Sequence, residues 1–439
     1  MDEKIGKPPI PKSEQGLAAL RALWQERSVL AALSALHREM GDIFQIPLPG
    51  FNPVVMVGPE ANRFVLVSGR EKLLWRNEVD PVVDLLHRGV LVIDGDSHDS
   101  IRKELNPSIH RRMVAGFVET MITSTDEVVE AWQQGQTVNM LDEMRKIALL
   151  ILMRTVFGIN FQDRIGSMWD PILKNISYIS PGLWVVWPGV PRLGYRSARK
   201  KLDAYLFEVI QQRRRESING DDLLSYLVFE TGMPDELIRD QLLTLLIAGH
   251  DTSTASLAWT LYLLGKHPDW MRQVAEEVDT VSGSKAPTIE ILKSLPVLDR
   301  VSKEALRLYP PIHLGARVAA EDLEFNGYHI PAGQRVVYSI YLSHRHPAYW
   351  DAPDTFNPDR FLPEKVRERP HYVYLPFGGG LRNCIGFSFA QVELPLVLAR
   401  IFQRTSLQLS PRQVHRHMGA TLEPRPGVFM KVEQRKLQP

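Results

Sequence analysis

The most informative segment of this chain is Pro376-Phe377-Gly378-Gly379-Gly380-Leu381-Arg382-Asn383-Cys384-Ile385-Gly386, which leads into a helical pattern from about Phe387. It places the only thiol of the chain just before a helix, two residues after an arginine. Helix N-termini and nearby cations stabilise a thiolate, and glycines let a flat ligand approach the backbone. An isolated cysteine is usually a small apolar filler of the core. This whole run instead indicates a thiolate that binds a metal.

Composition limits the classes of function. The chain has 439 residues, of which 44% are hydrophobic and 23% charged, which is typical of a globular protein. It carries 52 basic and 51 acidic side chains, so nothing suggests a polyanion such as nucleic acid as partner. A single cysteine excludes an intramolecular disulfide, a zinc ribbon and an iron–sulfur cluster held by several thiols.

Two segments bear on membrane attachment. The N-terminal residues 1–9 are charged and proline-rich rather than basic and then apolar, as a signal peptide would be. The longest apolar stretch, about 242–264, has His250 and Asp251 in its middle, which favours a buried core helix over a membrane span. We therefore expect a soluble, cytoplasmic protein without a membrane anchor.

The order of the predicted elements indicates a mainly α protein with small β-sheets (α+β). Residues 43–46 and 54–57 are predicted to form a hairpin, and strand patterns return at 323–330, at 335–340 and beyond Leu407. Between about 111 and 275 the apolar spacing is mostly helical. No G-x-G-x-x-G follows a strand, so a built-in flavin or nicotinamide domain is not expected. We predict one large domain over 1–439 without a fused reductase.

A polar break interrupts the long apolar helix at Ala248-Gly249-His250-Asp251-Thr252. Glycine, an acid and an alcohol are poor helix formers at positions where leucine would serve better. Two explanations remain open from these residues alone. The break is either a kink bonded to its own backbone or a proton-delivery pair that faces a cavity.

Two further segments carry weaker signals. Glu304 and Arg307 place opposite charges three residues apart on one helix face, and Arg360 in the stretch 357–361 could join a buried charge network with them. Residues 176–195 hold aromatic side chains among prolines. That segment either caps an edge of the core or forms an apolar lip over a ligand channel.

These segments, in this order and spacing, resemble the cytochrome P-450 superfamily of soluble, bacterial-type haem-thiolate monooxygenases. Residues 377–386 match F-G-x-G-x-R-x-C-x-G, residues 248–252 match A-G-x-D-T, and residues 304–307 match E-x-x-R. Residues 357–361 resemble the arginine-containing loop of the family, with aspartate where glutamate is commoner. The resemblance extends from the early hairpin to the end of the chain. It implies the cytochrome P-450 fold, with haem b between the long helix and the cysteine loop.

The resemblance also implies roles for single residues. Cys384 would be the axial thiolate and therefore the metal ligand. Asp251 and Thr252 would deliver protons during the activation of dioxygen, while His250 would pack against neighbouring helices. The remaining cofactor-binding positions are those of the cysteine loop that would lie against the haem and the basic residues that would meet its propionates: Phe377, Gly378, Gly386, His98, Arg102, Arg317 and Arg382.

The implied reaction inserts one oxygen atom of dioxygen into an apolar organic substrate, such as a fatty acid, a terpenoid or a steroid-like molecule. An external ferredoxin or flavodoxin with its reductase would supply electrons on the Cys384 side, and we expect a monomer. The pocket would draw on 85–88, 245–252, 311–315 and residues near Thr421. Arg88 or His87 could hold a substrate carboxylate at the entrance.

Three alternatives remain at this stage. The first is a peroxygenase of the same fold that runs on hydrogen peroxide, although the intact Asp251–Thr252 pair favours dioxygen. The second is a non-catalytic haem-binding sensor, which the same pair argues against. The third is a hydrolase with Cys384 as nucleophile, for which the chain lacks a clear Cys–His–Asn signature.

Overall fold

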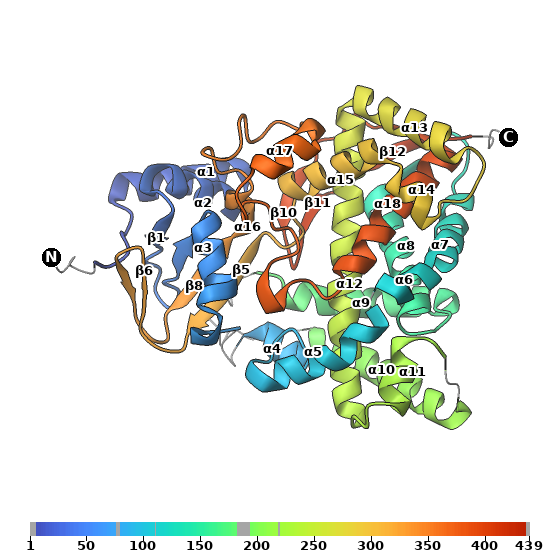
Figure 1. Cartoon of the computed structure of the whole chain (residues 1–439), viewed down its shortest axis with the longest axis horizontal. Helices are drawn as coiled ribbons and strands as arrows, with labels where there is room; N and C mark the ends of the chain where they lie inside the picture. Colours follow the sequence, from blue (N-terminus) through green and yellow to red (C-terminus); the bar gives the residue numbers. More distant parts are fainter. Residues whose placement is uncertain (1–5, 76–79, 110, 182–193, 218–219, 436–439) are drawn as a thin grey trace.

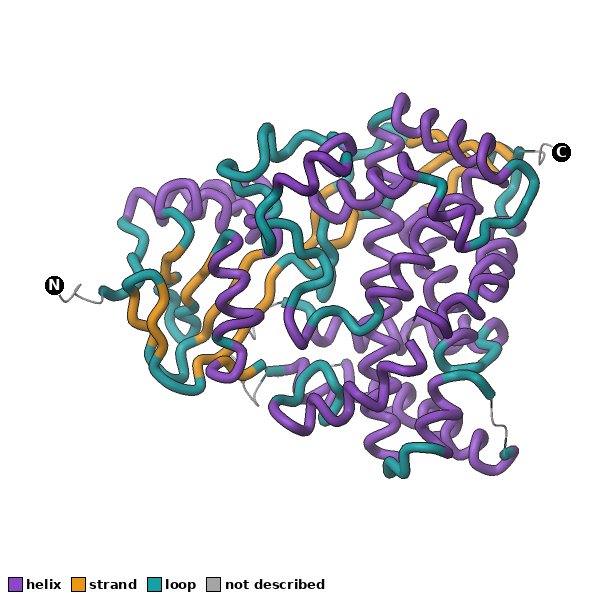
Figure 2. The backbone as a smooth tube through the Cα atoms, in the orientation of Figure 1, coloured by secondary structure: helices purple, strands orange, loops and turns teal. Residues whose placement is uncertain are grey.

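A large helical body lies beside a smaller part that holds most of the strands (Figures 1 and 2). The computed structural model describes residues 6–75, 80–109, 111–181, 194–217 and 220–435. Its helices confirm the predicted mainly α class. The longer helices are α1 (Ser13–Glu26), α2 (Val29–Met40), α5 (Gly95–Ile109), α7 (Val118–Glu130), α8 (Met140–Thr155), α9 (Ile165–Ile179), α10 (Tyr195–Glu216), α12 (Asp235–Lys266), α13 (Pro268–Ser282), α15 (Pro296–Leu308) and α18 (Phe387–Arg404).

Shorter helices connect these elements. The α-helical ones are α3 (Pro59–Arg63), α4 (Pro81–Leu86), α6 (Arg111–Gly116), α11 (Leu223–Phe229), α14 (Ile289–Lys293), α16 (Ile340–Ser343) and α17 (Pro363–Glu368). The 3-10 and π turns are η1 (Phe64–Ser68), η2 (Arg70–Lys72), η3 (Gln162–Arg164), η5 (Pro358–Phe361) and η6 (Gly380–Arg382).

The largest sheet joins strands from both ends of the sequence. Its order is β1-β2-β8-β5-β3, and the predicted hairpin is its first pair, with Phe44 opposite Val55. β2 runs parallel to β8, whereas β5 is antiparallel to β8 and β3. The strands are β1 (Ile43–Gln45), β2 (Val54–Met56), β3 (Leu73–Leu74), β5 (Leu314–Ala319) and β8 (Arg335–Ser339).

Three smaller sheets complete the β structure of the described residues. β6 (Leu323–Phe325) and β7 (Tyr328–Ile330) form the hairpin predicted around Gly327, whose φ of 75° suits glycine. β10 (His415–Met418) pairs with β11 (Leu422–Arg425). The third sheet has the order β4-β12-β9, with strands β4 (Thr137–Asn139), β9 (Thr405–Leu409) and β12 (Phe429–Gln434). Strand β4 lies inside the region that we expected to be helical. It was not predicted because it is too short to show a clear pattern.

Helix α12 runs through the centre of the helical body (Figure 1). It packs against α8, α10, α15 and α18 and buries the run from Leu242 to Ile247. Pro234 precedes the helix, acidic residues fill its first turn, and His267-Pro268 follow its last residue. The apolar stretch is therefore a core helix, as predicted. Among the described ranges, every helix is too short or too polar to cross a bilayer.

The predicted charge network is buried inside the protein. Arg307 donates to both carboxylate oxygens of Glu304, at 2.7 and 2.8 Å, and both side chains are 0% exposed. Arg360 Nε lies 3.4 Å from Glu304 Oε1. Arg307 also donates to the carbonyl groups of His344 and Pro353, so it joins α15 to the segment that follows α16. The network is structural, as we expected.

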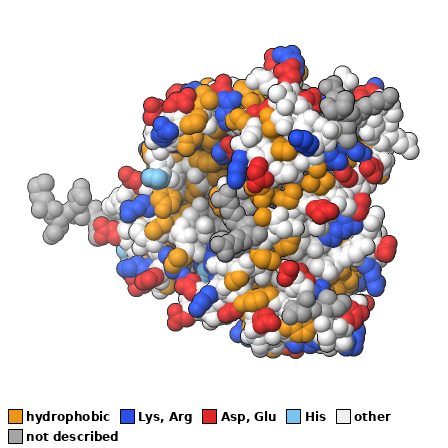
Figure 3. Space-filling model, turned by 45° about the vertical axis from the view of Figure 1, so that its right-hand side comes forward, with side chains coloured by type: hydrophobic (Ala, Val, Ile, Leu, Met, Phe, Trp, Pro, Cys, Tyr) orange, Lys and Arg blue, Asp and Glu red, His pale blue; other side chains and the backbone are white. Residues whose placement is uncertain are grey.

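The surface in Figure 3 mixes acidic, basic and hydrophobic side chains without a field of one sign. This agrees with 52 basic against 51 acidic residues.

Candidate active site

The cysteine loop connects η6 to the N-terminus of α18. The backbone N–H of Cys384 donates to the carbonyl of Phe377 at 2.8 Å, which closes the loop. Gly378 has φ +70° and Gly380 has φ +66°, and a Cβ at Gly380 would lie 2.3 Å from the carbonyl oxygen of Leu66. Glycine is therefore required where the loop passes η1.

The Cys384 residue is exposed, although protein atoms surround its sulfur. The side chain retains accessible surface, yet burial raises the pKa of the thiol, against a hydrogen bond from the Gly386 N–H and the charge of Arg102. Surface that remains open while protein atoms surround the sulfur is what a metal-binding thiol needs. A cation placed there would reverse the effect of burial, because a coordinating thiol loses its proton.

Helix α5 holds the two residues of the predicted H-x-x-x-R pair against the loop. Arg102 donates to the backbone and side-chain oxygens of Asn383, at 2.8 and 2.7 Å. His98 is 2% exposed and bonds Asp99 at 2.7 Å. Burial lowers the pKa of His98, which the Asp99 bond only partly offsets. The structure thus brings Arg102 next to Cys384.

Basic side chains gather on the same side of the loop. Arg382 donates to Asp94 at 2.5 Å, and burial lowers the pKa of Arg382 to about 10, with Arg317 and Arg70 adding to that effect. Asp94 and Asp99 are the carboxylates that oppose it. Three guanidinium groups therefore meet two carboxylates, which leaves an excess of positive charge.

Arg317 adds to this excess of positive charge. It is 4% exposed in β5, and among the described residues it forms no ion pair. Its guanidinium lies 4.2 Å from the centre of the Trp75 ring, and Arg382 lies 5.4 Å from the same ring. Buried positive charge is unfavourable without a counter-ion. A haem with two propionates fits this charge and the exposed thiol beside it.

Asp251 is buried in the middle of α12. Its side chain is 2% exposed and accepts a hydrogen bond from the Thr421 hydroxyl at 2.6 Å. Burial and the nearby Glu423 raise the pKa of Asp251 to about 6, against Arg145 and Thr421. The Asp251 carboxylate therefore bonds a residue outside its own helix, unlike a simple kink. Its raised pKa also lies in the range that suits a proton donor near neutral pH.

Arg145 of α8 connects Asp251 with a second acid. Its guanidinium lies 3.6 Å from Asp251 Oδ1 and 2.5 Å from Glu423 Oε1. Glu423 also pairs with Arg425 at 2.9 Å, and the Arg425 side chain is 52% exposed. The charges form a continuous series from the buried helix to the surface.

The other two residues of the polar break have different surroundings. Thr252 donates to the Ala248 carbonyl at 2.6 Å, and both residues are partly exposed where most of α12 is buried. His250 donates from Nε2 to the Arg145 carbonyl at 3.2 Å, and burial lowers the pKa of His250 to about 3. His250 is therefore a neutral packing residue, as predicted.

Sequence reasoning missed Glu393 of α18. It is 1% exposed and accepts from the Ser253 hydroxyl at 2.5 Å, next to Thr252 in α12. Burial raises the pKa of Glu393 to about 7. A carboxylate in the apolar run that follows the cysteine loop was the available signal. Arg145 and Glu423 had no such signal.

The two predicted entrance residues, His87 and Arg88, have different surroundings in the structure. His87 accepts a hydrogen bond from Arg199 at 2.8 Å, so its lone pair is engaged. The Arg88 backbone N–H donates to Asp240 at 3.1 Å while its side chain is exposed. In the aromatic segment, Tyr178 and Tyr195 stack edge to face at 5.3 Å. The rest of that prediction, including Trp184 and Trp187, lies outside the described residues.

A cavity of about 710 Å³ opens beside the cysteine loop rather than between it and α12. It lies between the loop, α15 and α18, and its lining includes Pro376, Phe377, Phe387, Lys303 and Gln391. Cys384, Asp251 and Thr252 do not line it. This groove therefore lies apart from the predicted site residues Cys384, Asp251 and Thr252.

Comparisons with known proteins agree on one family. The family model "Cytochrome P450" matches residues 9–434. The chain is 32% identical over 425 residues to cyclooctatin synthase of Streptomyces melanosporofaciens, covering 93% of this chain and 90% of that one. It is 30% identical over 418 residues to cyclooctat-9-en-7-ol 5-monooxygenase of the same organism, covering 91% and 89%.

A solved structure shows the same fold. A cyanobacterial cytochrome P450 with bound retinoic acid aligns with a TM-score of 0.86 and 26% identity, covering 98% of this chain and all of that one. The fold predicted from the sequence is thereby confirmed. With a family match over nearly its whole length, the chain belongs to the cytochrome P450 family and is a haem-dependent monooxygenase.

Proposed function

We propose that this enzyme holds haem b through Cys384 and oxidises a largely apolar cyclic molecule of the terpenoid class. The observation that carries the proposal is the arrangement of the accessible Cys384 thiol beside the excess of guanidinium groups around Arg382. His98, Arg102 and Arg317 would complete the propionate site, and Phe377, Gly378 and Gly386 would lie against the porphyrin. When bound, the haem supplies the activation of dioxygen and the insertion of one oxygen atom.

The substrate class rests on relatives and on the side chains of the predicted pocket. One relative is named for oxidising cyclooctat-9-en-7-ol, and the structural neighbour binds retinoic acid. In this chain Leu85, Leu86 and Leu245 are buried aliphatic residues of the segments predicted to line the pocket. Such walls favour apolar ligands with few polar groups.

A carboxylate on the substrate would be held by Arg88 rather than His87. The Arg88 side chain is exposed, whereas His87 already accepts from Arg199. Replacing Arg88 with alanine should weaken the binding of retinoic acid and leave the binding of retinol unchanged. Equal affinities of the wild type and of Arg88→Ala for retinoic acid would rule out this role of Arg88.

Proton delivery is proposed to pass through Asp251 and Thr252. Thr252 lies on the partly exposed side of α12, and Asp251 is joined to the surface by Arg145, Glu423 and Arg425. Asp251 would take up a proton from the outer acid and release it toward Thr252. This intact path supports dioxygen over hydrogen peroxide as oxidant.

Electrons would come from an external ferredoxin or flavodoxin with its reductase, acting on a monomeric enzyme. The groove beside the cysteine loop offers a docking position close to Cys384, with Lys293, Lys303 and Asp299 at its edge. Lys303 is paired with Asp299 at 2.6 Å, so an acidic partner would meet the exposed Lys293, and its binding should weaken as salt increases.

The first test is the absorption spectrum of the reduced, carbon-monoxide-bound protein beside that of Cys384→Ser. We expect a strongly red-shifted Soret band in the wild type only. Turnover of terpenoid substrates with dioxygen and a ferredoxin system would then be compared with turnover on hydrogen peroxide. A histidine-type spectrum would contradict the ligand, and activity with peroxide alone would favour the peroxygenase.

A further inference from the structure

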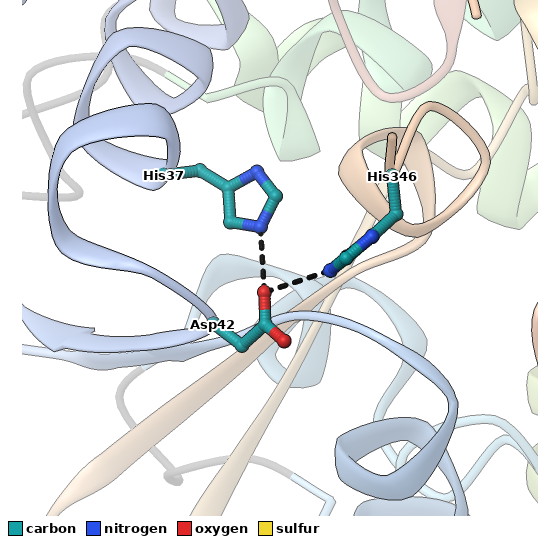
Figure 4. A group of neighbouring side chains, drawn as sticks. All are labelled: His37, Asp42 and His346. Atoms are coloured by element: carbon teal, nitrogen blue, oxygen red, sulfur yellow. Dashed lines mark hydrogen bonds and ion pairs between the residues drawn. The ribbon is translucent and has the colours of Figure 1, made fainter. Parts of the chain in front are cut away.

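Three metal-ligating side chains from separate parts of the sequence meet beside β1 (Figure 4). His37 lies in the last turn of α2, Asp42 lies between α2 and β1, and His346 follows α16. Both Nε2 atoms contact Asp42 Oδ1, His37 at 2.8 Å and His346 at 2.9 Å. The three ligand atoms all lie within 4.8 Å of one another. None of these residues has a part in the proposed reaction.

The cluster is rigid on one side and open on the other. The histidine side chains are only 10% and 12% exposed, and their rings pack edge to face at 5.2 Å. The Asp42 side chain is 51% exposed. Packing therefore fixes the two imidazoles, while the carboxylate faces solvent and leaves room for an ion that keeps a water ligand.

The three side chains supply ligand types that suit a transition metal. Asp42 offers a carboxylate oxygen, and His37 and His346 each offer a ring nitrogen. The cluster thus offers one carboxylate and two imidazoles. Zinc sites with an open position commonly use three protein ligands of these types.

We propose that His37, Asp42 and His346 bind a divalent transition metal of the zinc class, with water as the fourth ligand. Tetrahedral bonds of about 2.0–2.1 Å place neighbouring ligand atoms about 3.3 Å apart. Each nitrogen–oxygen contact must therefore lengthen by about half an ångström on binding. Because packing fixes the imidazoles, rotation of the half-exposed Asp42 side chain supplies this movement.

One existing contact opposes binding. The Ala348 N–H donates to His346 Nδ1 at 3.1 Å, so the neutral ring carries its proton on Nε2. A metal at Nε2 requires the proton on Nδ1 instead. Binding therefore breaks this exposed hydrogen bond, which water can replace at small cost. We expect a site that is weaker than a structural zinc centre but specific.

Binding would join two segments of the sheet-rich part. The metal would cross-link the end of α2 to the turn that follows α16, two elements that are distant in sequence and contact each other directly. A ligand that binds only the folded state raises the melting temperature with its concentration. Zinc should therefore stabilise this protein measurably.

The test uses the full-length, haem-loaded enzyme without an affinity tag, freed of loose metal by EDTA and dialysis. Calorimetric titration with zinc chloride would be compared among wild type, His37→Gln, His346→Gln and the control His329→Ala. Glutamine keeps a donor for Asp42 but is a poor zinc ligand. His329 is a matched control because it contacts Asp322 at 3.2 Å, and that pair belongs to no three-ligand group among the described residues.

We expect one zinc per chain in the wild type and in His329→Ala, with a rise in melting temperature, and at least a tenfold loss of affinity in each glutamine variant. The carbon-monoxide spectrum should be the same in all four proteins, which separates this test from that of the haem site. Absence of zinc binding to the wild type would overturn the proposal. Equal binding in the His37→Gln/His346→Gln double variant would do the same, because the zinc would then lie elsewhere.

Discussion

The hydroxyl of Thr421 donates to the carboxylate of Asp251 at 2.6 Å, across 170 residues of sequence. This contact holds the acid of α12 against the β10–β11 turn. Arg145 lies 3.6 Å from the other carboxylate oxygen, Oδ1, and pairs with Glu423. The environment of Asp251 therefore comes from elements distant in the chain, and its protonation depends on all of them.

The raised pKa of Asp251 makes stability depend on pH. Its folded-state pKa is about 6, against 3.8 for an ordinary aspartate. The contribution of the group to stability is fully present below pH 4 and is lost as pH rises toward 6. Urea unfolding from pH 4 to 7 should show this loss in the wild type relative to Asp251→Asn, whereas parallel curves would contradict it.

Glu423→Gln should slow proton delivery without emptying the haem site. The amide cannot pass a proton to Asp251, and removing the negative charge should lower the pKa of Asp251. We expect turnover with dioxygen to fall about tenfold or more, with more hydrogen peroxide released per NADH and a larger solvent isotope effect. Arg404→Ala, which breaks a surface pair with Glu130, is the control. An unchanged isotope effect would leave Glu423 as a structural residue.

The parts of the site that could be predicted from sequence are those carried by local patterns. The cysteine loop and its helix, the polar break of α12 and the Glu304–Arg307 pair each lie within a short segment whose residue types limit the alternatives. The sequence is enough to identify the Glu304–Arg307 pair, and only its burial has to come from the tertiary structure.

The rest depends on contacts between distant residues. Arg145 and Glu423 are 278 positions apart and have unremarkable neighbours in sequence. His37 and His346 are two of thirteen histidines, and nothing local distinguishes them from the others. Short β4 was missed for a related reason, because its three residues become a strand only by pairing with β12.

Arg307→Ala should destabilise the protein severely. It leaves the buried charge of Glu304 with only the longer contact to Arg360, at 3.4 Å, and removes hydrogen bonds to His344 and Pro353. Breaking a buried ion pair costs about 3–5 kcal/mol. The midpoint of urea unfolding should fall accordingly, whereas Arg272→Ala, which breaks an exposed pair with Asp269, should change stability by about 1 kcal/mol or less. Similar midpoints for both variants would show that the network contributes little.

Arg317→Leu should reduce haem retention rather than stability of the haem-free fold. The guanidinium is buried beside Trp75 without an ion pair among the described residues, so the bound haem would supply its counter-ion. Leucine removes the unfavourable buried charge, and the haem-free variant should unfold at an equal or higher urea concentration than the haem-free wild type. Transfer of haem to apomyoglobin should become at least several-fold faster. Equal transfer rates in the two proteins would place the propionates elsewhere, with Arg102 and Arg382 as the next residues to replace.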